Sequence, residues 1–227
     1  MSNCHNQADM RALAAEERAN LNLGPFAALN PYDLAAEHGI PVYGICELIE
    51  NGCTTEAIEH FTRRQLGKWS AALVPQGTGR FIIENTAHSP RRRRSSVAHE
   101  LSHQLLEHEF DSVLLADDGS CRFDKEKEGQ ARFLSGQLLI PDQAAVRAAF
   151  RGTTNYQLAA RYGVSPDFAQ WRMSGARVIA DRAARKQAGA GGIRDFAQHS
   201  RSYPSAARRP NGPPPVTSEE GQRLAPW

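Results

Sequence analysis

The sequence predicts an α+β fold: a small mixed sheet, a helix that carries two histidines, a following helix that carries a carboxylate, and a C-terminal helical segment. Three observations predict it. Residues 99–103 read H-E-x-x-H inside an apolar, helix-forming run. Residues 69–84 alternate as two strands around a glycine-containing turn. Residues 126–140 have a second helical pattern, which Pro141 ends.

Length and composition fit one folded domain with a small appendage. The 227 residues are 41% hydrophobic and carry a formal net charge of +2, so composition does not demand a nucleic-acid partner. No apolar stretch approaches the ~20 residues of a membrane span, and residues 1–15 lack the apolar core of a signal peptide. The cysteines are scattered, without the spacing of a metal finger: Cys4, Cys46, Cys53 and Cys121. We therefore expect reduced thiols and a cytoplasmic protein.

The N-terminal elements follow from capping signals. Residues 10–20 form a polar, Ala-rich helical stretch. A clearer helix is expected over residues 31–38, with Asn30 as its N-cap, Pro31 at its first position and Gly39 as its stop. The chain then continues into a strand.

Three further elements are expected before the histidines: a strand at residues 40–45, a helix at residues 53–66 and a hairpin with strands at residues 69–75 and 80–84. Thr54 or Thr55 can cap the helix. The second hairpin strand, residues 80–84, could be an edge strand that pairs with an extended substrate peptide. A plain strand inside the sheet is the alternative.

The H-E-x-x-H helix carries the strongest chemical signal. His99 and His103 are four residues apart, so on a helix both imidazoles project from one face and can bind one metal ion. Glu100 is next to the first histidine, where it can reach a metal-bound water as a general base. Ser95 or Ser96 would be the N-cap. A helix with two half-buried histidines and no metal is the alternative.

A catalytic zinc normally has three protein ligands, so a third donor is expected downstream. Glu128 is the best candidate because it lies on the next helix. Glu126 is a rival, although it lies one turn off the apolar face. His108 is another, but five residues beyond His103 it would be turned away from that ligand on a continuous helix. A surface glutamate that pairs with neighbouring basic residues is the alternative for Glu128.

Two motifs together carry a resemblance to a known family. The matching positions are Ala98, His99, Glu100 and His103 in the first motif, then Glu128, Gln130, Ala131, Leu138, Leu139 and Pro141 in the second. With these residues the chain resembles the ImmA/IrrE metallo-endopeptidases of bacteria and their mobile elements. Residues 31–42 are similar to the family's N-terminal helix and strand. Residues 161–165 and Arg172 are similar to its C-terminal helical segment, so the resemblance covers roughly residues 25–180.

The resemblance implies a zincin-like fold in which His99, His103 and Glu128 bind Zn²⁺ and Glu100 is the general base. It also implies a narrow substrate, a helix-turn-helix transcriptional repressor that controls mobile-element transfer or a stress response. The sequence departs from the family at Arg132, where Asn or Asp is common, and this leaves open the outer partner of a zinc-bound histidine.

Several other features of the sequence have two possible interpretations. The basic run at residues 91–94 could hold an acidic substrate segment or a phosphate backbone, or could be a solvated loop. Residues 154–176 could be a DNA-reading helix-turn-helix, but their second helix is not strongly basic, so a helical pair packed on the core is favoured. Tyr156, Tyr162 and His108 could stabilise a transition-state oxyanion, although a structural role is favoured for each.

Four segments are expected along the chain: a polar helical extension at 1–24, the metallopeptidase domain at 25–150, a helical segment at 151–187 and a disordered tail at 188–227. The helical segment is split into two helices at Gly163, and Ser165 and Pro166 begin the second one.

Besides the zinc endopeptidase, two functions remain open. One is a regulatory protein of the same fold that binds DNA or a repressor without cleaving, and the other is a metal-dependent hydrolase of a non-peptide bond.

Overall fold

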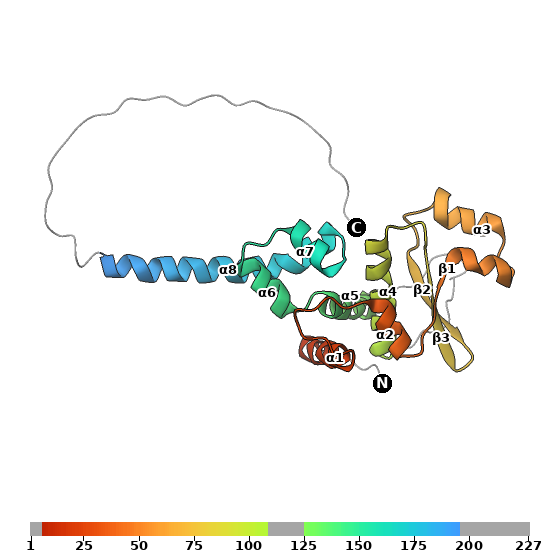
Figure 1. Cartoon of the computed structure of the whole chain (residues 1–227), viewed down its shortest axis with the longest axis horizontal. Coiled ribbons are helices and arrows are strands. Elements are labelled where there is room, and N and C mark those ends of the chain that lie inside the picture. The colour runs from red at the N-terminus through yellow and green to blue at the C-terminus, as the bar shows by residue number, and fades with distance from the viewer. Residues whose placement is uncertain (1–5, 109–124, 196–227) are drawn as a thin grey trace, which may run out of the picture. The chain divides into compact units, whose positions relative to one another are not determined.

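The structure, a computed structural model, describes residues 6–108 and 125–195 and has the α+β fold that the sequence predicts (Figure 1). The elements before the hairpin are α1 (Gln7–Asn20), α2 (Pro31–Glu37), β1 (Val42–Gly44), the 3₁₀ helix η1 (Ile45–Asn51), α3 (Thr55–Glu59) and the π-helix η2 (His60–Arg64). The hairpin consists of β2 (Ala71–Gln76) and β3 (Gly79–Glu84). The later helices are α4 (Pro90–Leu105), α5 (Lys125–Leu139), α6 (Asp142–Phe150), α7 (Asn155–Tyr162) and α8 (Pro166–Asp195).

The three-stranded sheet has the order β1-β3-β2. The predicted hairpin is confirmed: β2 pairs antiparallel with β3, and the turn between them contains Gly77 with a φ of +59°. β1 lies parallel to β3 on its other side, and Ile82 N donates to Pro41 O at 2.9 Å. Of the two interpretations of residues 80–84, the plain strand inside the sheet is therefore confirmed and the edge strand is wrong, because β1 covers that side of β3. Within the described residues, β2 forms an edge instead.

The core is centred on α4, which contacts α5, α2 and the strands β2 and β3. Figure 1 shows α4 and α5 beside one another, with the sheet next to α4. Val97, Ala98 and Leu101 of α4 are fully buried, and Leu134 and Leu138 of α5 meet them in the same hydrophobic cluster. This burial fixes α4 between the sheet and the second long helix, so its remaining face determines what the site can do.

α4 begins earlier than the sequence suggested. Ser89 is its N-cap, with an Oγ that accepts from Arg92 N at 3.4 Å, and Pro90 occupies the first position. Ser95 and Ser96, the expected caps, lie inside the helix and donate to carbonyls four residues back. The run of arginines at residues 91–94 therefore belongs to the first two turns of α4 and does not form a loop.

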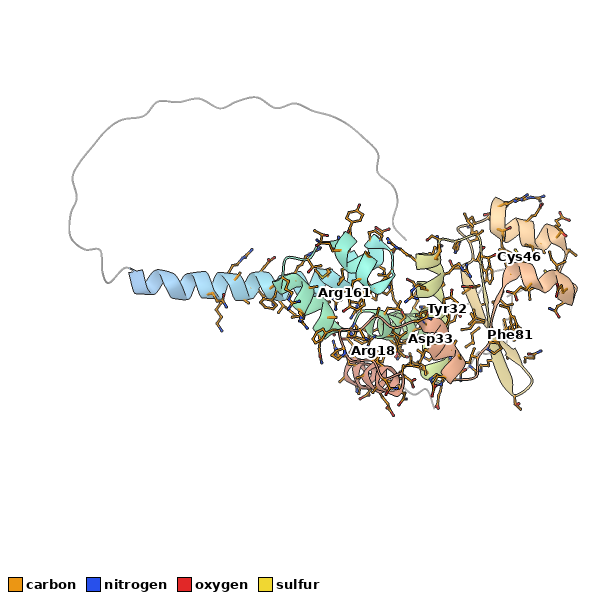
Figure 2. The ribbon with its side chains drawn as sticks, viewed as in Figure 1. Arg18, Tyr32, Asp33, Cys46, Phe81 and Arg161 are labelled. Carbon is orange, nitrogen blue, oxygen red and sulfur yellow. The ribbon has the colours of Figure 1, made fainter. Side chains whose placement is uncertain are left out.

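α1 is part of the core, although residues 1–24 were expected to be a polar extension. It packs against α5, with Met10 and Ala14 buried. Arg18, labelled in Figure 2, is 2% exposed and donates to the backbone oxygens of Leu138 and Gly24. A helix leaves its last carbonyls without internal partners, so Arg18 satisfies one at the end of α5. Met1–Arg185 accordingly form one compact unit.

The helix predicted over residues 53–66 is interrupted. Thr54 caps α3 by accepting from Ala57 N at 3.3 Å, as expected, but the α-helix ends at Glu59 and η2 continues it as a π-helix. Inside η2, Thr62 Oγ1 donates to Ile58 O at 2.8 Å. Such side-chain bonds to the preceding turn compete with the regular helical bonds.

The C-terminal helices pack on the core. The helical segment is divided at Gly163 as expected, and this glycine is left-handed, with a φ of +65°. Ser165 caps α8, with its Oγ accepting from Phe168 N at 3.1 Å. Leu158 of α7 and Met173 of α8 are buried. Tyr162 Oη donates to Phe26 O at 3.2 Å, and the neighbouring Arg161, labelled in Figure 2, also reaches that oxygen.

The last helix is longer than predicted. The helical segment was expected to end at residue 187, but α8 continues to Asp195. Residues 196–227, the remainder of the predicted tail, lie outside the described residues. None of the helices in the described part of the chain is both long enough and apolar enough to cross a membrane.

Candidate metal centre

The two motif histidines meet on one face of α4. Their Nε2 atoms are 3.2 Å apart, as the one-turn separation requires. The ring of His103 is buried and that of His99 is half-buried. The face that they form is directed toward α5, which packs along α4.

Glu128 of α5 completes a three-residue cluster with them. Its Oε2 lies 3.1 Å from His99 Nε2, and its Oε1 lies 3.3 Å from His103 Nε2. The three residues can each offer one donor atom so that all lie within 4.8 Å of one another. The structure thus brings together His99, His103 and Glu128, the three residues predicted as ligands. Glu126, the sequence-based rival, is not a member of this cluster.

The charges in the cluster suit a cation. Hydrogen bonds from His103 and His99 hold the pKa of Glu128 well below its usual range. Burial by itself would lower the pKa of His99, but the hydrogen bond to Glu128 and the charge of Glu100 outweigh burial and raise it. An ionised carboxylate and two imidazoles from two packed helices are the donor set of a catalytic zinc site. The residues present therefore fit a zinc ion.

Glu100 stays outside the cluster. Its Oε2 accepts a hydrogen bond from Leu73 N of β2 at 3.0 Å. Burial raises the pKa of Glu100, while the nearby His99 and His103 and the Leu73 N–H partly oppose that rise. The carboxylate is thus next to the candidate metal site without being one of its donors, which is the placement expected of a base.

The backbone of β2 explains why Leu73 is available to Glu100. Asn85 N donates to Ser70 O at 2.9 Å, so that residue pair is hydrogen-bonded across the hairpin. Bonded and non-bonded pairs alternate along an antiparallel ladder. Leu73, three positions on, is therefore at a non-bonded position, and its backbone groups face away from β3 and toward α4.

His108 lies against His103, contrary to the expectation that it would be turned away. The two Nδ1 atoms are 2.9 Å apart, and His108 Nε2 is 2.9 Å from Gln130 Oε1 on α5. The expectation assumed that the helix continues, but α4 ends at Leu105. Glu107, with a φ of +52°, then turns the chain back. Because glutamate is an unusual residue at such a turn, the sequence carried no signal for it.

The arginines at the start of α4 hold the fold together. Arg93 pairs with Glu84 of β3, and Arg94 Nη2 donates to Leu29 O at 2.7 Å. Tyr32, labelled in Figure 2, also donates to Glu84, at 2.7 Å. Burial and this hydrogen bond raise the pKa of Tyr32 to about 12. Arg93 and Arg94 are therefore half-buried side chains that bond within the fold, and the run is helical instead of a solvated loop.

Other candidates from the sequence have structural contacts elsewhere. Arg132 places its guanidinium over the Trp171 ring, 5.0 Å from the centroid. Tyr162 is buried against Phe26, and Tyr156 is 75% exposed on α7. Neither tyrosine belongs to the histidine–glutamate cluster.

Comparison with known proteins adds one result. Residues 54–174 match the family described as the IrrE N-terminal-like domain, which is classified among the peptidases. The match runs from the cap of α3 into α8, so it includes His99, Glu100, His103 and Glu128. No curated protein matches the chain.

Proposed function

The chain belongs to the peptidase family of the IrrE N-terminal-like domain, and on that premise we propose that it is a zinc-dependent endopeptidase with a specific protein substrate. One observation carries the proposal. Two imidazoles from α4 and a carboxylate from α5 present donor atoms within 4.8 Å of one another, while Glu100 lies beside them and is bonded elsewhere.

The residues have separate roles in this proposal. His99, His103 and Glu128 hold the zinc, which when bound acts as a Lewis acid toward water and the scissile carbonyl. Glu100 takes a proton from the water as the new C–O bond forms, and it passes that proton to the amine nitrogen as the C–N bond breaks. Burial raises the pKa of Glu100 above its ordinary value, which favours transfer of the proton from the water to this carboxylate.

An extended substrate would pair with β2. The Leu73 N–H faces outward from the sheet and lies 3.0 Å from Glu100 Oε2. A peptide that adds to this edge by β-augmentation therefore lies close to the general base, and it would donate its N–H groups to the carbonyls of β2, because the Leu73 N–H is already bonded. This position replaces the one expected at residues 80–84, since β3 is the central strand.

The substrate that we propose is a helix-turn-helix transcriptional repressor, whose cleavage would derepress genes of a mobile element or a stress response. The resemblance of the two motifs to the ImmA/IrrE enzymes supports this part. In that family the repressor gene often lies beside the peptidase gene, which supplies a candidate to test.

The test uses the full chain, loaded with zinc, and the repressor encoded beside its own gene. We expect one discrete cleavage, located by mass spectrometry of the products. Glu100→Gln should keep the fold and the zinc but lose cleavage, because an amide cannot accept the proton. Glu126→Gln is the matched control and should still cleave. Cleavage by Glu100→Gln at the wild-type rate would remove Glu100 as the base.

The same variant, tested in a reporter assay, distinguishes an enzyme from a regulatory protein that binds the repressor without cleaving it. If Glu100→Gln relieves repression in a reporter assay as well as the wild-type chain does, cleavage is not the basis of regulation. We expect relief of repression to disappear together with cleavage.

A further inference from the structure

The turn after α4 places His108 over His103. His108 N donates to His103 O at 3.0 Å, and Glu107 N donates to Gln104 O at 3.0 Å. These two bonds, with Glu107 in the left-handed conformation, form a Schellman motif. Such a motif typically brings the second residue beyond the C-cap against the third residue before it. Here those residues are His108 and His103, and their rings are 5.1 Å apart between centroids.

Two contacts of His108 indicate how the ring protons are arranged once a metal occupies His103 Nε2. Gln130 Oε1 can only accept, so His108 Nε2, 2.9 Å away, donates to it. In the neutral imidazole the other nitrogen, Nδ1, then has a lone pair. The partner at 2.9 Å, His103 Nδ1, must therefore carry the proton of that hydrogen bond. Without a metal, His103 Nε2 donates to Glu128 Oε1 at 3.3 Å. A metal that takes the place of this proton leaves His103 with its other ring proton, on Nδ1, directed at His108.

We propose that His108 and Gln130 are positioning residues that hold His103 in the tautomer needed for metal binding. The inference rests on the proposed function, because it assumes that His103 Nε2 binds a metal. Histidine ligands generally donate their second ring N–H to a carboxylate, carbonyl or water, which fixes ring and tautomer. In this chain an imidazole takes that place and is itself held by an amide. This answers the question that Arg132 left open, because Arg132 contacts Trp171 instead.

The contact is buried, so its loss should cost more free energy than the loss of an exposed contact would. The side chains of His103 and His108 are almost fully buried, at 6% and 5% exposure. A buried donor that loses its acceptor costs the full penalty of desolvation. Removing the acceptor should therefore affect His103 directly, and through it the affinity for zinc.

The test compares two variants of equal shape in the metal-binding assay. His108→Leu removes the acceptor, whereas His108→Asn can place its Oδ1 near the position of the lost Nδ1. We expect the zinc dissociation constant, measured by competition with a chelating indicator, to rise about 10–100-fold in His108→Leu. His108→Asn should recover most of the affinity. His38→Leu, which removes an imidazole that bonds Glu17, is the control and should bind like the wild type.

A spectroscopic measurement separates positioning from packing. In ¹⁵N-edited NMR of the zinc-loaded chain, we expect an exchange-protected proton on His103 Nδ1 and a proton on His108 Nε2. The first signal should be lost in His108→Leu and kept in His108→Asn. Equal zinc affinities for these two variants, or a proton found on His108 Nδ1, would overturn the inference.

A second pair guards against a folding defect in His108→Leu. Gln130→Met removes the acceptor at the far end of the chain of hydrogen bonds, whereas Gln130→Glu keeps an oxygen there. We expect the methionine variant to bind zinc more weakly than the glutamate variant, and the reverse order would count against the inference. If the wild-type chain itself binds no zinc, the proposed function fails; if it binds zinc and these variants match it, only the role of His108 and Gln130 fails.

Discussion

Glu128 joins the two helices of the candidate metal centre, because it is the donor that α5 contributes. We expect Glu128→Gln to weaken zinc retention by more than the 10–100-fold that the loss of an outer partner costs. Glu126→Gln, two residues earlier on the same helix, should change retention little. Metal analysis after dialysis against a chelator measures both. The opposite order would move the third ligand to Glu126, and one zinc per chain in a variant with both histidines replaced by alanine would contradict the site.

Among individual residues, the sequence predicted the positions of those whose geometry follows from helical spacing. His99 and His103 had to share a face, and Glu128 lay on the next helix of the pattern. His108 could not be placed, since its position depends on where α4 ends. A residue five positions on points away while the helix continues, but here the helix ends two residues after His103. Only the conformation of Glu107 reverses the direction, and no glycine or asparagine marked it.

Two glycines of α5 should respond oppositely to the same substitution. A Cβ at Gly136 would lie 2.8 Å from Cη2 of Trp171, whereas a Cβ at Gly129 would have nothing within 4 Å. We expect Gly136→Ala to lower the free energy of unfolding by about 1–3 kcal/mol through overpacking. Gly129→Ala should raise it by up to about 1 kcal/mol through helix propensity. Urea unfolding of both variants measures the difference, and equal effects would mean that α8 does not pack on α5 at Gly136.

The left-handed conformation of Glu107, just after the end of α4, leads to a prediction about stability. A non-glycine residue in the left-handed region destabilises the folded state by roughly 1–2 kcal/mol. Glycine removes this cost, but its greater conformational freedom also stabilises the unfolded chain, so the net gain is smaller. We therefore expect Glu107→Gly to stabilise the protein by about 0.5–1 kcal/mol in urea unfolding. Gly152→Ala introduces the reverse change at a φ of +63° with open space around it, and it should destabilise by a similar amount. A neutral result for Gly152→Ala would show that these turns tolerate a Cβ without cost.

Elements were predictable where a local signal marks them. Proline at the first turn identified α2, and a glycine-containing turn identified the hairpin. The start of α4 was missed because three serines, at positions 89, 95 and 96, could each cap it. The order of the sheet was also missed. Strand neighbours depend on contacts between distant residues, such as Val42 with Ile82, which periodicity does not reveal.

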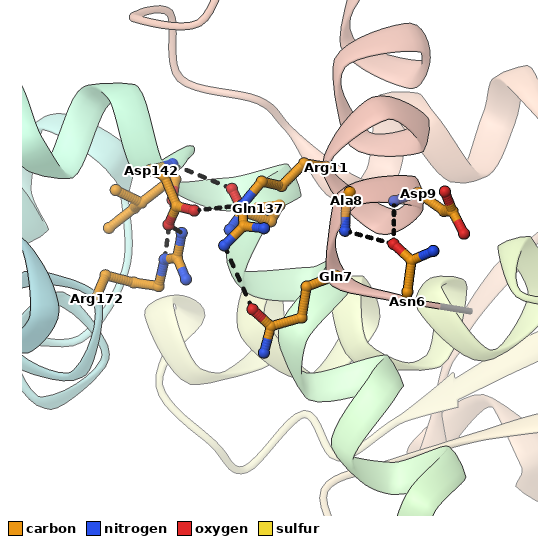
Figure 3. Close-up of polar contacts among 9 residues, drawn as sticks. Asn6, Gln7, Ala8, Asp9, Arg11, Gln137, Asp142 and Arg172 are labelled. Carbon is orange, nitrogen blue, oxygen red and sulfur yellow. Dashed lines mark hydrogen bonds and ion pairs between the residues drawn. The ribbon is translucent and has the colours of Figure 1, made fainter. Parts of the chain in front are cut away.

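Asp142, the first residue of α6, connects that helix to α1, α5 and α8, as Figure 3 shows. Its carboxylate binds Arg11 of α1 at 2.7 Å and Arg172 of α8 at 2.8 Å. Its backbone N–H donates to Gln137 of α5 at 3.1 Å. Burial would raise the pKa of Asp142, but the hydrogen bond from Arg11 and the charge of Arg172 outweigh it and lower the pKa. The ionised form is thus the one that the folded chain prefers.

This preference predicts a pH-dependent stability. Because the pKa is lower in the folded state, the contribution is complete above the ordinary value near ~3.9 and is lost as pH falls through the folded pKa. We expect Asp142→Asn to cost on the order of 1 kcal/mol at pH 7, a modest value because the carboxylate is 42% exposed. The difference from wild type should shrink toward pH 3 in urea unfolding. Asp181→Asn, on an exposed part of α8, is the control, and a pH-independent difference for Asp142→Asn would contradict the assignment.

The outer edge of β2 also bears on whether copies of the chain associate. Two successive outward positions of this strand are Leu73 and Pro75. The N–H of Leu73 is already bonded to Glu100, and proline has none to offer. A strand from another molecule that approached this edge would find no available donor at either position. Unpaired sheet edges are a common route to aggregation, and the bond from Leu73 to Glu100 removes one of the donors that a second copy of the chain would need to pair here.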